Sequence, residues 1–523
     1  MSADAPGSVR EVRAFVRSRR RTSARLSDRY TSGFMLALLV AVLGRPVGEA
    51  VEGLAGQADL ARLGPGLALL ALSLTVGLAA ARALGPVTLP AADAAWLVLT
   101  PLDRRAVLSR SARALAMVAL VAGGLLGLGL IAVLGAPDQL VWRLVGAMVL
   151  GLSASAGGMA LAVLGQASQT WHAWLSVALA VLLVVAVVAA FGPVRAPLAA
   201  MAGAPVTAVA AAAAGAALFA ALLVRRAWVM LGRMPAGPLL AASTRAGQVA
   251  TAAVVLDPGA LAWIAEDNHW RGRKLRSARW PSMPAPLAMA WPDWLRLVRR
   301  PGRLAVVAAS AALPAVLAQA GGGGALVGVS VLAGGLAVAA TGVSGARRDQ
   351  DNPALARLLG VGTRQALLAR ALLPALLSGG WIAAALTAAD PGGWITAALA
   401  ATEPDSGWTA AALTATEPGG VGALWLFGPL VAPALAVAAL RMARRAPVDH
   451  SMPVIDTPGG AIPTGPMLWA FTGVDLALLG CLPAFVALTA PPADLTALLA
   501  AQALTGAAVL IAYVLRARPP RAR

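Results

Sequence analysis

Long apolar runs recur along almost the whole chain, and they limit its possible folds more than any other feature. A helix needs roughly 17–25 apolar residues to cross the hydrocarbon core of a membrane. Twelve runs of about that length are separated by polar segments, which predicts an all-α integral membrane protein with twelve spans. The predicted spans are residues 31–49, 63–85, 113–135, 141–164, 172–192, 205–224, 304–320, 324–345, 371–389, 420–440, 467–489 and 494–515.

The charges support this interpretation and indicate an orientation. Hydrophobic residues make up 59% of the chain and charged residues 12%, which is too apolar for a protein surface in water. The net charge of +19 comes from arginines that gather in alternate loops, as the positive-inside rule requires, so it does not indicate nucleic-acid binding. We therefore expect a multi-pass protein of the cell membrane, with both termini in the cytoplasm and anionic lipids against its basic face. The polar, Arg-rich start of the chain is unlike a cleaved signal peptide.

A short polar passage occurs twice and indicates a duplication. "TPLDRRAVLSR" spans residues 100–110 and "GVGTRQALLAR" spans residues 360–370, each between the second and third spans of a six-span half. An amphipathic segment precedes each half, with the apolar residues Val9, Val12, Phe15 and Val16 in the first and Trp291, Trp294, Leu295 and Val298 in the second. We predict a first half at residues 1–224, a cytoplasmic linker at 225–284 and a second half at 285–523.

This plan resembles the permease subunits of ABC-2-type (type V) ATP-binding-cassette exporters, in a fused form that supplies both halves. In that family an interfacial helix precedes the first span, and a coupling helix between spans two and three docks on a cytosolic ATPase. The resemblance implies a separate ABC ATPase subunit as partner, with no cofactor bound by this chain. It assigns the coupling role to Leu99, Arg104 and Leu108 in the first copy and to Leu359, Arg364 and Leu368 in the second. The copies differ where Gly360 and Gly362 replace Thr100 and Leu102.

The sequence lacks the motifs of an enzyme. No G-x-x-x-x-G-K-[ST] stretch occurs, so the chain cannot be its own P-loop ATPase, and no nucleophile and base stand at catalytic spacing. A single cysteine, Cys481, excludes a disulfide framework and a cysteine-rich metal cluster. Glu266, Asp267 and His269 lie close together, but they have no matching ligand pair, and a polar helix end near anionic lipid explains them better than a metal.

Two features inside the predicted spans bear on function and packing. Asp475 lies in the span 467–489, where a carboxylate is costly, which makes it a candidate for a substrate or ion pathway. The alternative is a structural Asp, either protonated or near the interface, that is bonded to a neighbouring helix. Gly123 and Gly127 form a small-residue face, as do Gly151 and Ser155, and both faces predict close helix contacts.

A threefold local repeat begins at Gly379, Gly392 and Gly407, in the segment that follows the ninth span. We expect re-entrant or interfacial helices there, with Trp394 and Trp408 at the level of the lipid headgroups.

Two other classes of protein share parts of this pattern. A major-facilitator-like secondary transporter also has twelve spans in two halves, but its loop motif is matched here only by the fragment Asp103-Arg104-Arg105. A membrane scaffold without transport activity would use the same basic surface. The absence of ATP-dependent activity would favour either of these alternatives.

Overall fold

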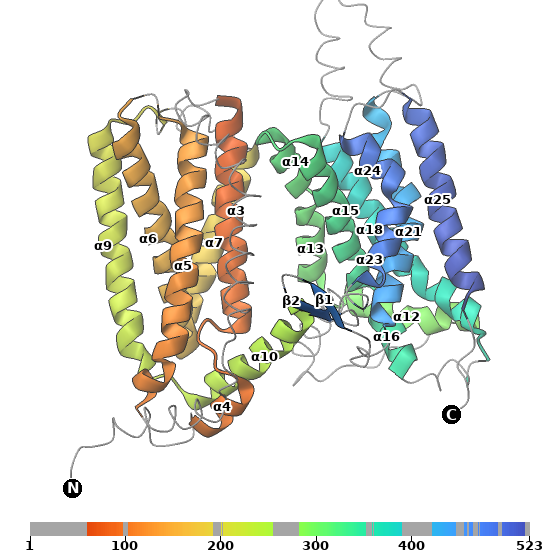
Figure 1. Cartoon of the computed structure of the whole chain (residues 1–523), viewed down its shortest axis with the longest axis horizontal. Coiled ribbons are helices and arrows are strands. Elements are labelled where there is room, and N and C mark those ends of the chain that lie inside the picture. The colour runs from red at the N-terminus through yellow and green to blue at the C-terminus, as the bar shows by residue number, and fades with distance from the viewer. Residues whose placement is uncertain are drawn as a thin grey trace, which may run out of the picture. The chain divides into compact units, whose positions relative to one another are not determined.

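The computed structural model describes residues 60–97, 103–136, 138–191, 200, 202–254, 282–351, 358, 360–389, 421–445, 454–457, 460–463, 469, 471–489 and 494–517. Nine helices among these residues are long and apolar enough to cross a membrane, or ten if one bent pair forms a single span. The protein is therefore a helical membrane protein with many spans (Figure 1). The predicted first span, residues 31–49, lies outside the described residues.

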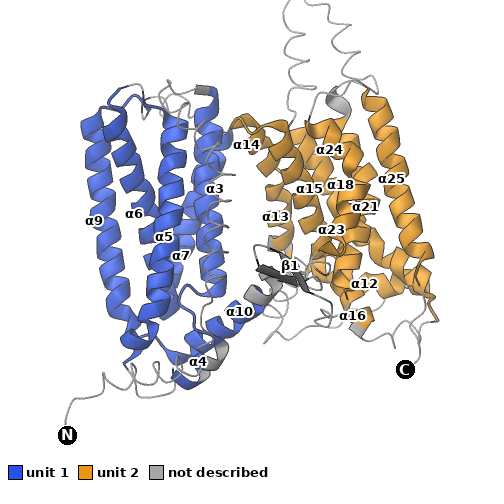
Figure 2. Cartoon of the chain, viewed as in Figure 1, with its two compact units in different colours: residues 1–250, 454–462 blue, residues 251–453, 463–523 orange. Residues whose placement is uncertain are grey.

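The chain divides into two compact units (Figure 2). Unit 1 comprises residues 1–250 and 454–462, and unit 2 comprises residues 251–453 and 463–523. The helices of unit 1 are α3 (Leu60–Leu84), α4 (Ala91–Leu97), α5 (Arg104–Leu134), α6 (Leu140–Ala167), α7 (Gln169–Phe191), α9 (Val206–Leu231) and α10 (Ala236–Val254), whose last residues belong to unit 2. In this unit α6 packs against α5, α9, α7 and α3.

Small residues allow α5 and α6 to approach closely, as the sequence predicts. A Cβ added at Gly151 of α6 would collide with the backbone of Gly123 and Gly127 on α5. Such contacts drive helix association in lipid, where apolar side chains gain nothing from leaving water. The glycines of this small-residue face therefore hold the centre of unit 1 together.

Unit 2 is built around α21, whose residues are mostly buried. Phe427, Val431 and Leu435 of α21 pack against Trp381 and Ile382 in one apolar core. The helices of unit 2 are α12 (Ala285–Val298), α13 (Pro301–Ser310), α14 (Leu313–Gln319), α15 (Gly324–Thr341), α16 (Ser344–Asp351), α18 (Thr363–Ala389), η1 (Val421–Leu426), α21 (Phe427–Ala443), α23 (Val474–Gly480), α24 (Leu482–Thr489) and α25 (Leu495–Leu515). A two-stranded sheet joins β1 (Val454–Thr457) and β2 (Gly460–Pro463).

Two predicted spans are broken helices. Residues 304–320 form α13 and α14, and residues 467–489 contain α23 and α24, with Pro314 and Pro483 in the first turns of the following helices. Proline has no N–H to donate, so a helix readily restarts at such a residue. At the second break, the buried Gln502 of α25 donates to the carbonyl of Gly480 at 2.6 Å and accepts from the N–H of Ala484 at 3.1 Å. Its side chain thereby satisfies backbone groups that the break leaves free.

Two segments that were predicted to lie outside the spans are parts of long helices. Helix α9 continues to Leu231, so it includes the first residues of the predicted linker, and residues 255–281 of that linker lie outside the described residues. The first unit of the threefold repeat is the end of α18, where Trp381 is buried, while Trp394 and Trp408 lie outside the described residues.

Candidate functional site

The first predicted coupling passage lies at the start of a long helix. The side chain of Asp103 accepts from the N–H of Arg105 at 3.1 Å and caps α5, which continues without a break to Leu134. Residues 104–110 are therefore the first turns of the third predicted span, and not a separate loop helix. The separate helix between α3 and α5 is α4, which precedes this passage.

Two of the predicted coupling residues in unit 1 point into the unit. Leu108 is 1% exposed and packs in a core with Leu164, Leu231 and Met234. Arg104 donates to the carbonyl of Met234. Both side chains thus hold α5 against the segment between α9 and α10, so Leu108 has no surface to offer a partner. Leu99 lies outside the described residues.

The second passage is likewise the beginning of a long helix, α18. Arg364 is exposed and donates to the carbonyl of Leu515 at the end of α25, at 3.4 Å. Leu368 is 46% exposed and lines an apolar cavity beside Pro286 and Leu287 of α12. Leu359 lies outside the described residues. Among the described residues, helix α16 lies between α15 and α18.

A buried ionic cluster joins three elements of unit 2 near this passage. Arg370 of α18 donates from Nη1 to Asp293 Oδ2 at 2.6 Å, from Nε to Asp349 Oδ2 at 2.8 Å and from Nη2 to Asp349 Oδ1 at 3.0 Å. The side chains of Arg370 and Asp293 are only 6% and 5% exposed. Asp293 belongs to α12 and Asp349 to α16, so one guanidinium ties α12, α16 and α18 together.

The surroundings of this cluster keep its charges balanced. Arg296 donates to Asp293 Oδ1 at 3.1 Å, and the hydroxyl of Ser344 lies 3.4 Å from the same oxygen. A Cβ at position 345 would collide with Arg370 and Asp293, so only glycine allows α16 to come this close.

Burial raises the pKa of the Asp293 carboxyl, and the positive charge of Arg370 opposes this rise. The positive charge of Arg370 therefore favours the ionised form of this carboxyl.

Each loop also exposes one large apolar side chain. Trp96 of α4 is 77% exposed, and Leu358, between α16 and α18, is 84% exposed. Exposed aromatic and aliphatic side chains beside basic residues are typical of contact surfaces for proteins or for lipid.

Sequence reasoning missed these residues, although two signals pointed to them. Asp293 stands between Trp291 and Trp294 in the segment "WPDWLRLV", and a carboxylate among apolar residues requires a partner if it is buried. Trp96 is the one aromatic residue of the loop sequence between Leu84 and Arg104.

Asp475 lies at a helix end and not in the middle of a span. Helix α23 begins only at Val474, after Gly473 with φ 96°, which places Asp475 in its first turn. Its Oδ2 pairs with Arg441 at 2.9 Å, and both side chains are more than a third exposed. This arrangement is of the kind considered as the structural alternative for Asp475, and its role in a pathway stays a prediction.

No group of three or more potential metal ligands occurs among the residues that the structure describes. Glu266, Asp267 and His269 lie outside those residues.

The fold defines a membrane protein of the many-spanning helical class, with a buried ionic cluster at the base of one helix bundle. Residues 58–453 match the Family of unknown function (DUF6297), and the chain belongs to that family. No curated protein and no solved structure matches the chain.

Proposed function

We propose that this chain is the permease subunit of an ATP-driven exporter that resembles the ABC-2 type, with two six-span halves in one polypeptide. A separate cytosolic ATPase subunit docks on the loops that contain α4 and α16, on the predicted cytoplasmic side. The exported substrate passes through the membrane domain, and the chain itself hydrolyses nothing.

Helices at equivalent places in the two units pack against one another in the same pattern, which supports the duplicated plan. In unit 1, α6 packs against α5, α9, α7 and α3, and in unit 2, α21 packs against α18, α25, α23 and α15. One further pair also corresponds, because α3 packs on α7 as α15 packs on α24.

Both units have a close backbone contact of the same kind at the central helix. Gly151 of α6 meets Gly123 and Gly127 of α5, and Gly428 of α21 meets Gly379 and Ala383 of α18. The equivalent residues of α5 and α18 are 256 residues apart, which is four fewer than the offset that aligns Arg104 with Arg364. A duplicated bundle accounts for this agreement without any further assumption.

The buried ionic cluster is the observation that carries the proposal. Arg370 holds α16 to α18 and to α12 with hydrogen bonds of 2.6–3.0 Å. A push on α16 from a soluble partner is therefore passed to the base of the third span, and packed helices respond to such pushes by shifting or rotating as units. An ATPase must supply the push, because the chain has no nucleotide-binding loop of its own.

The proposed docking residues differ from those that the resemblance assigned. Trp96 and Leu358 offer exposed apolar surface in the two loops, whereas Leu108 is buried. Apolar side chains that enter a pocket of the partner usually dominate such contacts, and charged rims contribute less.

Purification of the full-length chain from its native membrane, followed by assay of Mg·ATP hydrolysis in liposomes, tests this function. We expect ATPase activity to accompany the chain and to fall at least tenfold when Trp96→Asp and Leu358→Asp are combined, because two docking anchors are worth about 2 kcal/mol or more each. Trp425→Asp, at the other end of unit 2 in η1, is the matched control because Trp425 is also exposed, at 45%.

A preparation without ATPase activity would contradict the proposal and would favour a secondary transporter or a scaffold. Activity that remains unchanged in the double variant would exclude the two loops as the docking site.

A further inference from the structure

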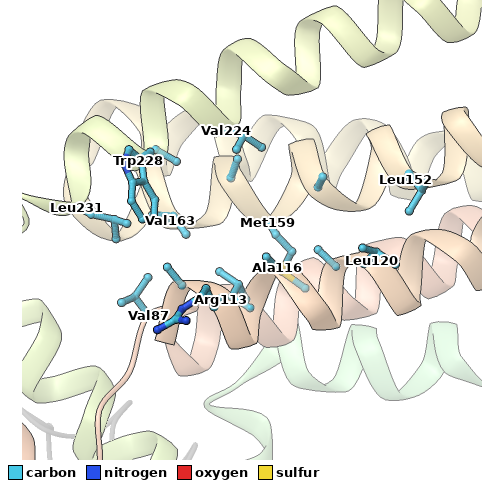
Figure 3. Close-up of a pocket in the computed structure, with 16 residues that line it drawn as sticks. Val87, Arg113, Ala116, Leu120, Leu152, Met159, Val163, Val224, Trp228 and Leu231 are labelled. Carbon is cyan, nitrogen blue, oxygen red and sulfur yellow. The ribbon is translucent and has the colours of Figure 1, made fainter. Parts of the chain in front are cut away.

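Unit 1 contains an apolar cavity of about 370 Å³ between α5, α6 and α9 (Figure 3). This volume is in the range of sites that hold small ligands. The lining is almost entirely apolar, and small side chains such as Ala116 and Ala156 leave the space open. Arg113 is the one charged residue among those that line it.

The cavity is elongated along the helices. Figure 3 shows Leu120 and Leu152 at one end and Trp228, Leu231 and Val87 at the other. Leu120 lies seven residues beyond Arg113 on α5, which corresponds to about 10 Å along the helix axis. The long direction of the cavity therefore follows the direction in which α5 crosses the membrane.

The polar end of the cavity lies at the depth of the lipid headgroups. Helix α5 has 31 residues and is about 46 Å long, so it exceeds the ~30 Å hydrocarbon core by several turns. Arg113 lies nine residues after its start, and Trp228 lies three residues before the end of α9. Arginine and tryptophan at these positions are typical of the membrane interface.

Arg113 is free to bind a ligand. It is exposed, and its Nε makes one long contact of 3.4 Å to the carbonyl of Ser109. Within the described part of the chain no carboxylate pairs with it. Leu120 and Trp228 are 59% and 48% exposed, so the cavity is open to the surface of the unit along its length.

Unit 2 has a cavity of about 380 Å³ at the matching place, between α18, α21 and α25, but without the charge. Its lining includes Leu372 and Ala375, which are 260 residues after Ala112 and Leu115 in the cavity of unit 1. No arginine lines it, and Pro286 and Leu287 of α12 cover part of it. The cationic end is therefore particular to unit 1.

From this geometry we propose that the cavity of unit 1 binds one anionic phospholipid. An acyl chain lies along α5, α6 and α9, and the phosphate group pairs with Arg113. An apolar slot with one cation at headgroup depth complements an anionic amphiphile, because the chain loses water contact while the charge stays at the interface. The proposal does not rest on the exporter function and applies to any role of this protein.

Photolabelling of the full-length protein in phosphatidylcholine liposomes tests the proposal. Trace phosphatidylglycerol or phosphatidylcholine carries a photoreactive group on the acyl chain, and labelled peptides are mapped by mass spectrometry. We expect phosphatidylglycerol to label the α6 peptide around Met159 about fivefold more than phosphatidylcholine does, since one cation near an anionic headgroup contributes ~1 kcal/mol.

Matched variants separate the charge from the cavity. Arg113→Gln is expected to remove the preference for phosphatidylglycerol, Arg113→Lys to keep it, and Arg110→Gln, on the same helix but outside the lining, to leave it unchanged. Ala156→Phe fills the cavity and is expected to abolish labelling by both lipids, whereas Ala154→Phe on the exposed face of α6 is not.

Equal labelling by the two lipids in the unmodified protein would overturn the proposal, as would a preference that survives Arg113→Gln. Absence of label from the α6 peptide would also overturn it and would indicate that another occupant, such as a segment of this chain, fills the cavity. If Ala156→Phe does not yield a monodisperse protein, the comparison of Arg113→Gln with Arg113→Lys alone decides whether the cavity binds an anionic phospholipid.

Discussion

Arg370 contacts two carboxylates that lie 77 and 21 residues before it in the chain. Its sequence context, "GTRQALLAR", marks it only as one basic residue of a loop that follows the positive-inside rule. In the structure its side chain is buried, with 6% exposed, and its charge pairs with the carboxylates of Asp293 and Asp349. A buried ion pair adds little net stability compared with apolar residues, but it fixes which elements lie together.

Removal of the Arg370 charge takes from Asp349 its ion-pair partner and leaves Asp293 with Arg296 alone. We expect Arg370→Leu to lower the free energy of unfolding by about 3–5 kcal/mol, measured by thermal or denaturant unfolding in detergent. Arg364→Leu, at an exposed position on the same helix, is the control and is expected to change it by less than about 1 kcal/mol.

The pH dependence of the Arg370→Leu variant has a definite sign. Burial without Arg370 raises the pKa of Asp293 above its ordinary value of 3.8, so the folded state binds more protons than the unfolded state. The stability of the variant therefore falls as the pH rises above that value, and Asp293→Asn in the same background restores part of it at neutral pH. A variant whose stability does not change with pH would show that Asp293 is solvated.

At the level of the helices, the sequence predicts well where an apolar run is continuous. Helices α3, α6, α7, α15 and α25 begin and end within four residues of the predicted spans. Hydropathy did not reveal that α5 and α18 begin inside polar passages, because it does not measure helix propensity, and residues such as Arg104 and Arg364 favour helix about as much as the leucines that follow. Asp103 was the available signal, since an Asp before a helix-prone segment is a typical N-cap.

The small-residue contacts between helices give the sharpest prediction at this scale. Gly151→Leu puts a side chain into the backbone of α5, and we expect it to cost about 1–3 kcal/mol in the free energy of unfolding. Gly428→Leu is expected to act in the same way in unit 2. Gly215→Leu on α9 and Gly380→Leu on α18 are the controls, since a Cβ meets nothing within 4 Å at either position.

Thermal unfolding in detergent of all four glycine variants measures this difference. Equal midpoints for the contact variants and the controls would show that these helices do not rely on close approach of their backbones.

For the whole molecule, composition and charge sufficed to predict a helical membrane protein with many spans. Motif reasoning did not find Asp293, Asp349 or Trp96, because their importance depends on partners or exposure that only the tertiary structure provides. It did not indicate that Asp475 lies in the first turn of a helix that begins at Val474, since an apolar segment carries no signal for such a break. The proposed exporter function accordingly depends on contacts within the loops of each half and not on a motif.

The central claim is that α16 transmits a nucleotide-driven push to α18 through Arg370. The most direct measurement is the distance between spin labels at Leu368→Cys on α18 and Arg516→Cys at the end of α25, in a Cys481→Ser background with the ATPase bound. We predict that Mg·ATP shifts this distance by about 1–5 Å, and that Arg370→Leu removes the shift while the ATPase stays bound. A distance that is unchanged by Mg·ATP, or a shift of the same size in the Arg370→Leu variant, would contradict the account.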